Sequence, residues 1–164
     1  MRTSMVGLAA VAVMGCTSPP RTLDAGHASA LRDSVSDYLA GVAHRISVGG
    51  PKAWVAEFAD DSAFFMVANG QMAFNDFAAM SRFMPVFARG MPSIALGLSS
   101  VRVDPLAPGL AEFAAHYHET LTDSARRRTD DSGYVTGAAM HSALGWRLRD
   151  AHWSHPDPVG APPR

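Results

Sequence analysis

An aspartate and a histidine near the end of the chain form the pair best suited to acid–base chemistry. Side chains alternate between the two faces of a strand, so a strand over 146–153 would put four residues on one face: Trp146, Leu148, Asp150 and His152. The two apolar members indicate that this face points inward. A neighbouring carboxylate fixes the tautomer of an imidazole and stabilises its protonated form. His152, oriented by Asp150, is therefore predicted to act as a general acid or base in elimination, isomerisation or aldol-type cyclisation, with a structural histidine bonded to backbone as the alternative.

A second set of residues has the composition of a metal site. His116 and His118 share one face of a predicted strand with Glu112, and His141 could approach from the next strand. Two imidazoles and one carboxylate can hold a metal ion. The opposite face of the strand is more apolar, with Phe113, Ala115 and Tyr117. We therefore expect these histidines to face solvent or a second copy of the chain. Because the zinc-helix, phosphate-loop and nucleophile-elbow motifs are missing as well, we predict neither a metal nor a cofactor.

The elements that would position these residues fall into two groups. Apolar residues recur every three or four positions up to about residue 90, which predicts helices, and every second position afterwards, which predicts strands. Asn75 is the expected N-cap of the third helix, Pro85 is expected to kink or shorten it, and Ser99-Ser100 is an expected bulge. Segregated helices and strands define the α+β class. The predicted order is helices over about 28–49, 51–60 and 75–90 around a hairpin over 63–74, then strands over 94–103, 110–121, 133–144 and 146–153, with a charged loop over 122–132.

Length and composition indicate one globular domain. The chain has 164 residues, 48% of them hydrophobic and 18% charged, which excludes a disordered tail or a coiled coil. The net charge of −1 gives no electrostatic footprint for nucleic acid, so no nucleic-acid partner is expected. A single cysteine excludes a disulfide framework.

The first residues have the form of an export signal. A positive charge at Arg2 precedes an apolar run over 5–14, which is shorter than the roughly 20 residues of a bilayer span. The string Val13-Met14-Gly15-Cys16 resembles a bacterial lipobox. That resemblance implies that the cysteine carries a lipid, becomes the mature N-terminus, and holds the exported protein at the bacterial cell envelope. An ordinary cleaved signal with an incidental cysteine is the alternative.

Two further stretches carry a resemblance to a known superfamily. One is Trp54 followed by Phe58-Ala59-Asp60-Asp61-Ser62-Ala63-Phe64, and the other is Gly145-Trp146-Arg147-Leu148-Arg149-Asp150-Ala151-His152-Trp153-Ser154. They resemble the SnoaL-like branch of the nuclear transport factor 2-like superfamily. The resemblance covers roughly residues 28–155. It implies a cone in which a strongly curved antiparallel or mixed sheet wraps three helices and encloses an apolar pocket with one open end.

The resemblance also implies a division of the chain and a lining for the pocket. Residues 1–15 would be the signal peptide, 16–27 a tether, 28–155 the cone domain and 156–164 a flexible tail. Aromatic and methionine side chains are the candidates to line a ligand pocket, with plain core packing as the alternative for each. They are Trp54, Phe58, Phe64, Met66, Phe77, Met80, Phe83, Met84, Phe113 and Trp146, together with Tyr117.

Two classes of function remain open on the sequence. The first is a non-catalytic or ligand-binding lipoprotein that holds a small apolar molecule or an envelope protein. The second is a cofactor-free lyase or isomerase of the ketosteroid-isomerase or polyketide-cyclase type, with His152 as acid–base group, Asp150 as its orienter and Tyr117 as hydrogen-bond donor. The superfamily resemblance adds a homodimer through the outer sheet face as a further expected partner. An empty pocket that a buried polar group faces would favour the enzyme, and a packed cone would favour the binding protein.

Overall fold

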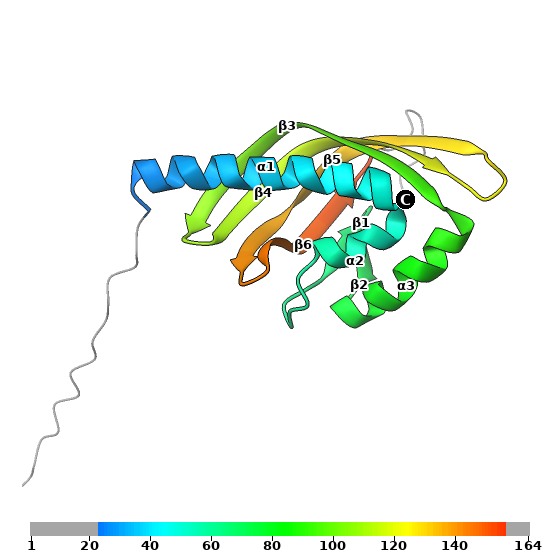
Figure 1. Cartoon of the computed structure of the whole chain (residues 1–164), viewed down its shortest axis with the longest axis horizontal. Coiled ribbons are helices and arrows are strands. Elements are labelled where there is room, and N and C mark those ends of the chain that lie inside the picture. Colours follow the sequence, from blue (N-terminus) through cyan, green and yellow to red (C-terminus); the bar gives the residue numbers. More distant parts are fainter. Residues whose placement is uncertain (1–22, 157–164) are drawn as a thin grey trace, which may run out of the picture.

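The computed structural model describes residues 23–156, and these form an N-terminal helical part packed on one mixed sheet, as predicted (Figure 1). The predictions for Cys16 and for the residues after 156 lie outside the described residues. Helix α1 lies along the sheet, and the shorter helices and the first hairpin gather near its C-terminal end. The elements are α1 (Ala25–Gly49), η1 (Pro51–Ala53), α2 (Trp54–Glu57), β1 (Met66–Ala68), β2 (Gln71–Phe74), α3 (Phe77–Gly90), β3 (Ser93–Ala107), β4 (Leu110–Thr122), β5 (Arg128–Ser142) and β6 (Gly145–Ser154).

Helix α1 buries the apolar stripe that the sequence predicts. The carboxylate of Asp24 caps its first turn by accepting a hydrogen bond from the His27 backbone N–H at 2.9 Å. The buried residues lie three or four positions apart: Val35, Leu39, Val42, Ala43 and Ile46. The helix ends at Gly50, where φ is +69° and an added Cβ would lie 2.8 Å from the Pro92 carbonyl oxygen. Glycine is required there for both reasons, and Pro51 then starts the next short helix.

The sheet has six strands in the order β2-β1-β6-β5-β4-β3. All pairings are antiparallel except that of β1 with β6, which is parallel. Asn69 and Gly70 form the turn of the β1–β2 hairpin with φ values of 51° and 76°, the backbone of a type I′ turn. Within residues 23–156, no helix is both long enough and apolar enough to cross a membrane.

Three local expectations need correction. The N-cap of α3 is Asp76 rather than Asn75, because the Asp76 carboxylate accepts the Ala79 backbone N–H at 2.7 Å. Pro85 does not shorten α3, which continues to Gly90. The charged segment expected as a loop over 122–132 is mostly strand: Asp123 closes a short turn by binding both the backbone N–H and the side chain of Arg127, and β5 begins at Arg128. Charged residues are tolerated in this part of β5 because it extends past β6 and remains solvated.

The bulge expected at Ser99-Ser100 is present, and β6 holds another one that the sequence does not reveal. The β3–β4 register shifts between Ser99 and Arg102, with Ser100 at a φ of 52°. In β6, Asp150 pairs with Ala138 and Leu148 pairs with Ala139, so Arg149 is the extra residue. A bulge ends the strict alternation of side chains between the two faces. A side chain before Arg149 therefore points to the opposite face of the sheet from one that lies an even number of positions later, after Arg149.

Candidate functional site

The interior of the cone is filled by the side chains that were expected to line a pocket. Nine of the ten predicted lining residues belong to one hydrophobic cluster or pack against it. Phe83 is the exception, because it lies on the outside of α3 and is 46% exposed. The members of the cluster are Phe58, Phe64, Met80, Met84 and Phe113, and those packed against it are Trp54, Met66, Phe77 and Trp146.

Aromatic contacts leave little free space in this interior. The rings of Phe58 and Phe64 meet edge to face at 5.2 Å between centroids, and Phe64 meets Phe77 in the same way at 5.9 Å. The gap between Leu39, Trp54 and the inner face of the sheet has a volume of about 10 Å³. A space of this size holds about one water molecule at most. This gap has no room for a small-molecule ligand.

Asp150 and His152 lie on the outer face of the sheet, away from this interior. Leu148 is buried in the core, whereas His152 is exposed, because the bulge at Arg149 reverses the alternation between them. The prediction that Trp146, Leu148, Asp150 and His152 share one inward face is therefore wrong. Asp150 accepts a hydrogen bond from the Ala138 backbone N–H at 3.0 Å. Burial raises the pKa of the Asp150 carboxyl, although this hydrogen bond and Arg149 act in the opposite direction.

Tyr117 does not join that pair. Its ring is 1% exposed on the inner face of β4, and its hydroxyl donates to the Asp131 carboxylate at 3.1 Å. Glu119 lies directly across the β4–β5 pair from Asp131. Burial, and then the Asp131 charge, raises the pKa of Glu119 to about 7. Sequence reasoning missed this pair of carboxylates because it assigned Asp131 to a loop.

The outer face of the sheet carries a groove of about 1060 Å³. Its floor consists of small residues on the two central strands, Ala114 on β4 and Thr136 and Ala138 on β5. Longer side chains on the flanking strands form the walls. They are Arg102, Asp104 and Leu106 on β3 and Arg149, Asp150 and His152 on β6. Leu110 and Glu112 of β4 also line the groove, so the floor of short side chains is the part over Ala114, Thr136 and Ala138.

The charged side chains of the groove take part in no direct ion pair within the described part of the chain. Residues 23–156 contain three ion pairs, His27 with Asp24, Arg45 with Glu57 and Arg127 with Asp123, and none includes a groove residue. Asp104 and Glu112 are directly opposite each other on adjacent strands. Like charges in this position are destabilising. Unfavourable local arrangements in proteins are found mainly at functional sites. The two facing carboxylates therefore make this groove a candidate binding site.

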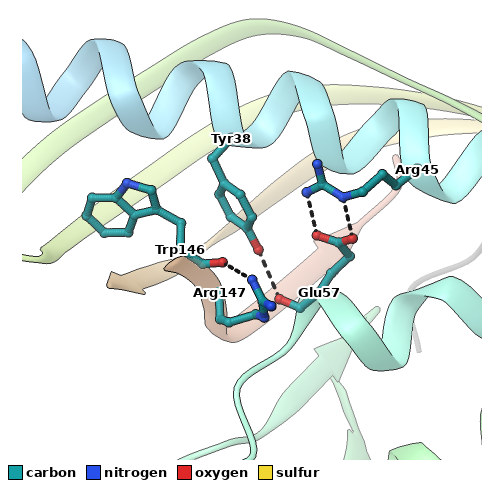
Figure 2. Close-up of polar contacts among 5 residues, drawn as sticks. All are labelled: Tyr38, Arg45, Glu57, Trp146 and Arg147. Carbon is teal, nitrogen blue, oxygen red and sulfur yellow. Dashed lines mark hydrogen bonds and ion pairs between the residues drawn. The ribbon is translucent and has the colours of Figure 1, made fainter. Parts of the chain in front are cut away.

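A polar network closes the opposite side of the cone, between α1, α2 and β6 (Figure 2). The Arg45 guanidinium binds both carboxylate oxygens of the buried Glu57, each at 2.7 Å, and the Tyr38 hydroxyl donates to the Glu57 carbonyl at 2.9 Å. Burial, and then the Glu57 charge, raises the pKa of Tyr38, with Arg147 opposing. The Arg147 guanidinium bonds the carbonyl of Trp146 at 2.7 Å. No buried side-chain nitrogen or oxygen within residues 23–156 lacks a hydrogen-bond partner, and this network connects α1 to α2.

The histidines weighed as metal ligands contact different parts of the sheet, although His116 and His118 share one face of β4. The His116 ring packs edge to face on Tyr134, and that of His141 packs edge to face on Trp146. His118 is exposed, and its ring lies over Gly97 of β3. Among residues 23–156, no three His, Cys, Asp or Glu side chains are grouped so as to hold a metal ion.

Comparison with known proteins places the fold. No protein-family model matches the sequence, and no curated protein matches it. A nuclear transport factor 2-like superfamily protein from Salmonella enterica serovar Typhimurium matches with a TM-score of 0.60 and 13% identity, over 80% of this chain and 92% of that one. A Streptomyces avermitilis protein, provisionally assigned as a dehydratase of the same superfamily, matches with a TM-score of 0.63 and 14% identity, over 77% and 97%. The protein Aln2 from a Streptomyces species matches with a TM-score of 0.57 and 14% identity, over 73% and 86%.

At these identities the likeness shows the fold alone. The chain has the α+β cone fold of nuclear transport factor 2-like proteins, as the sequence resemblance implied. Proteins of different activity share a fold, so the function must be argued from the surface and the interior just described.

Proposed function

We propose that the protein is a non-catalytic binding protein of the bacterial envelope that holds its ligand in the groove on the outer face of the sheet. One contrast carries the proposal: the interior gap is about 10 Å³, and the outer groove is about 1060 Å³. Ligand sites of soluble proteins have volumes of several hundred Å³ or more, so the groove is large enough for a ligand and the interior gap is not. Its charged side chains, none of which is in an ion pair within residues 23–156, supply groups for recognition.

Spectroscopic mapping tests which of the two spaces is used. Titration of ¹⁵N-labelled protein with a set of amino acids and short peptides should shift the backbone amides of residues 112–114, 136–138 and 149–152. A Thr136→Trp substitution fills the floor of the groove and should abolish those shifts. Ser132→Trp is the matched control, because Ser132 is exposed on the same face of β5 and lies outside the groove. Shifts confined to Leu39, Val42 and Leu96 would move the site to the interior and refute the proposal.

Anchoring at the envelope is the second part of the proposal and rests on Cys16. The lipobox-like string before it supports a diacylglyceryl group on this residue. Mass spectrometry of the membrane fraction should find that mass on the N-terminal peptide. A Cys16→Ala variant should not mature by this route, and unchanged maturation would contradict the anchor.

A cofactor-free lyase or isomerase is the alternative, with its acid–base residues in the outer groove and not in the interior of the cone. Asp150 and His152 both line the groove, and burial raises the pKa of Asp150, which favours a role in proton transfer. A panel of β-hydroxy ketones, followed by absorbance of the enone product, tests for elimination. Turnover that His152→Ala abolishes and His141→Ala leaves intact would establish this alternative over the binding protein.

A further inference from the structure

The charges of the outer groove are ordered in two rows that cross the sheet. One row is acidic and joins Asp104, Glu112 and Asp150 through Ala138, each paired with the next in the strand register. The second row lies two residues further along every strand. It consists of Arg102, Ala114, Thr136 and His152, again in register. Between the two rows, the charged side chains therefore change from Asp104, Glu112 and Asp150 to Arg102 and His152 over about 6.6–6.8 Å, the rise of two strand residues. Arg32 and Arg149 also line the groove.

This spacing matches that of an extended peptide. In an extended segment, side chains at positions i and i+2 point the same way and are also about 6.6–6.8 Å apart. A basic side chain at one position would meet Asp104 and Glu112, and an acidic one two residues on would meet Arg102. The repulsion between Asp104 and Glu112 would then be relieved by the ligand, which turns a cost of the free protein into affinity.

The width of the groove selects an extended segment over a helix. The walls stand on β3 and β6, with β4 and β5 between them. Three strand spacings amount to about 14 Å between the axes of the wall strands. Long side chains from both walls occupy part of that width. A helix about 10–12 Å in diameter would take up nearly all of the distance between the wall strands, whereas a single extended chain needs much less of it.

We infer that the groove binds an extended peptide segment of a protein partner that carries a basic side chain at one position and an acidic side chain two positions away. The inference rests on the proposed function, since it names the ligand class of the same groove. A second copy of this chain and a free amino acid are outcomes that the test separates from it.

Two peptides of equal composition provide the test. The first, acetyl-Thr-Lys-Thr-Glu-Thr-amide, presents both charges on one side when extended. The second, acetyl-Thr-Lys-Glu-Thr-Thr-amide, presents them on opposite sides. Calorimetric titration of the full chain should give at least tenfold weaker binding of the second peptide. Equal affinity for the two, or no binding of either, would overturn the inference.

Charge reversal sharpens the assignment to Arg102. The variant Arg102→Glu should lose affinity for the first peptide at least tenfold and gain affinity for acetyl-Thr-Lys-Thr-Lys-Thr-amide. Arg89→Glu, an exposed substitution on α3 away from the groove, should change neither. Loss without the compensating gain would mean that Arg102 does not face the acidic position. Light scattering of the same samples detects closure of the groove by a second copy, which would overturn the peptide as the occupant.

The two proposals fail in different ways. If the peptides do not bind but another small ligand shifts the groove amides, and Thr136→Trp abolishes this, the proposed function stands and the peptide inference falls. If Thr136→Trp leaves all binding unchanged, the groove is not the site and the proposed function falls as well.

Discussion

The two faces of the sheet differ in packing: the inner face is filled with apolar side chains, and the outer face carries a charged groove. On the inner face, Phe113 is buried in a continuous hydrophobic cluster, and the remaining gap is about 10 Å³. On the outer face, its neighbour Glu112 lines a groove of about 1060 Å³ and lacks an ion-pair partner within the described residues. The inner face therefore stabilises the fold, and the outer face is available for recognition. A cone fold does not by itself place the ligand inside the cone.

The largest effect is expected on the inner face. Phe113→Ala should lower the free energy of unfolding by about 3–5 kcal/mol, because it removes a buried aromatic ring and leaves a cavity. Urea denaturation measures the loss. A loss below about 1 kcal/mol, the typical effect of any point substitution, would mean that the interior is not tightly packed and would weaken the contrast between the faces.

The polar network beside the core should give the next largest effect. Arg45→Leu leaves the buried Glu57 carboxylate without its bidentate partner, which should cost about 2–3 kcal/mol. The same denaturation assay compares it with Arg32→Leu, an exposed arginine on the same helix with no ion pair in the described part. If the free energy of unfolding falls equally little in both variants, the network does not stabilise the fold.

Glu119 predicts a dependence of stability on pH. Its pKa in the folded protein is about 7, against 4.5 for the free side chain, so the folded state binds the proton more tightly. The stability from this group is fully present below pH 4.5 and is lost as the pH rises to about 7. Thermal melts of wild type and Glu119→Gln should therefore diverge over this window, with the glutamine variant becoming the more stable.

Asp131→Asn is the control for the cause of that shift. The substitution removes the Asp131 charge, which raises the pKa of Glu119 less than burial does. The pH range over which stability is lost should therefore become narrower but should not disappear. Parallel pH profiles of wild type and Glu119→Gln would show that Glu119 is not the titrating group.

The smallest effect is expected in the groove, and its sign is opposite to that in the core. Glu112→Gln removes the like-charge repulsion with Asp104 and should stabilise the free protein by about 0.2–1 kcal/mol. The gain should shrink at high salt, because both carboxylates are exposed and screened. Destabilisation by this substitution would mean that Glu112 has a structural role. The outer face would then stabilise the fold as the inner face does.

The sequence anticipated the elements better than the faces. Helix α1, the Asn69-Gly70 hairpin, the bulge in β3 and the order of the long strands follow from apolar spacing and turn residues, which are local properties. The start of β5 was missed because a run of charged residues resembles a loop when its strand partner is unknown. Pairing with β4 made it a strand.

The candidate site shows the same division. The sequence alone identified Asp150 and His152 as residues that share a face, and that holds in the structure, where both line the groove. Which face they share was decided by the extra residue Arg149 in β6, because a shift of one residue moves every later side chain to the other side. The two charge rows likewise exist only through the register of four strands, which no local pattern contains. Local spacing therefore determined the helices, the strands and the apolar residues of the core, while tertiary pairing decided which charges lie together and on which side of the sheet.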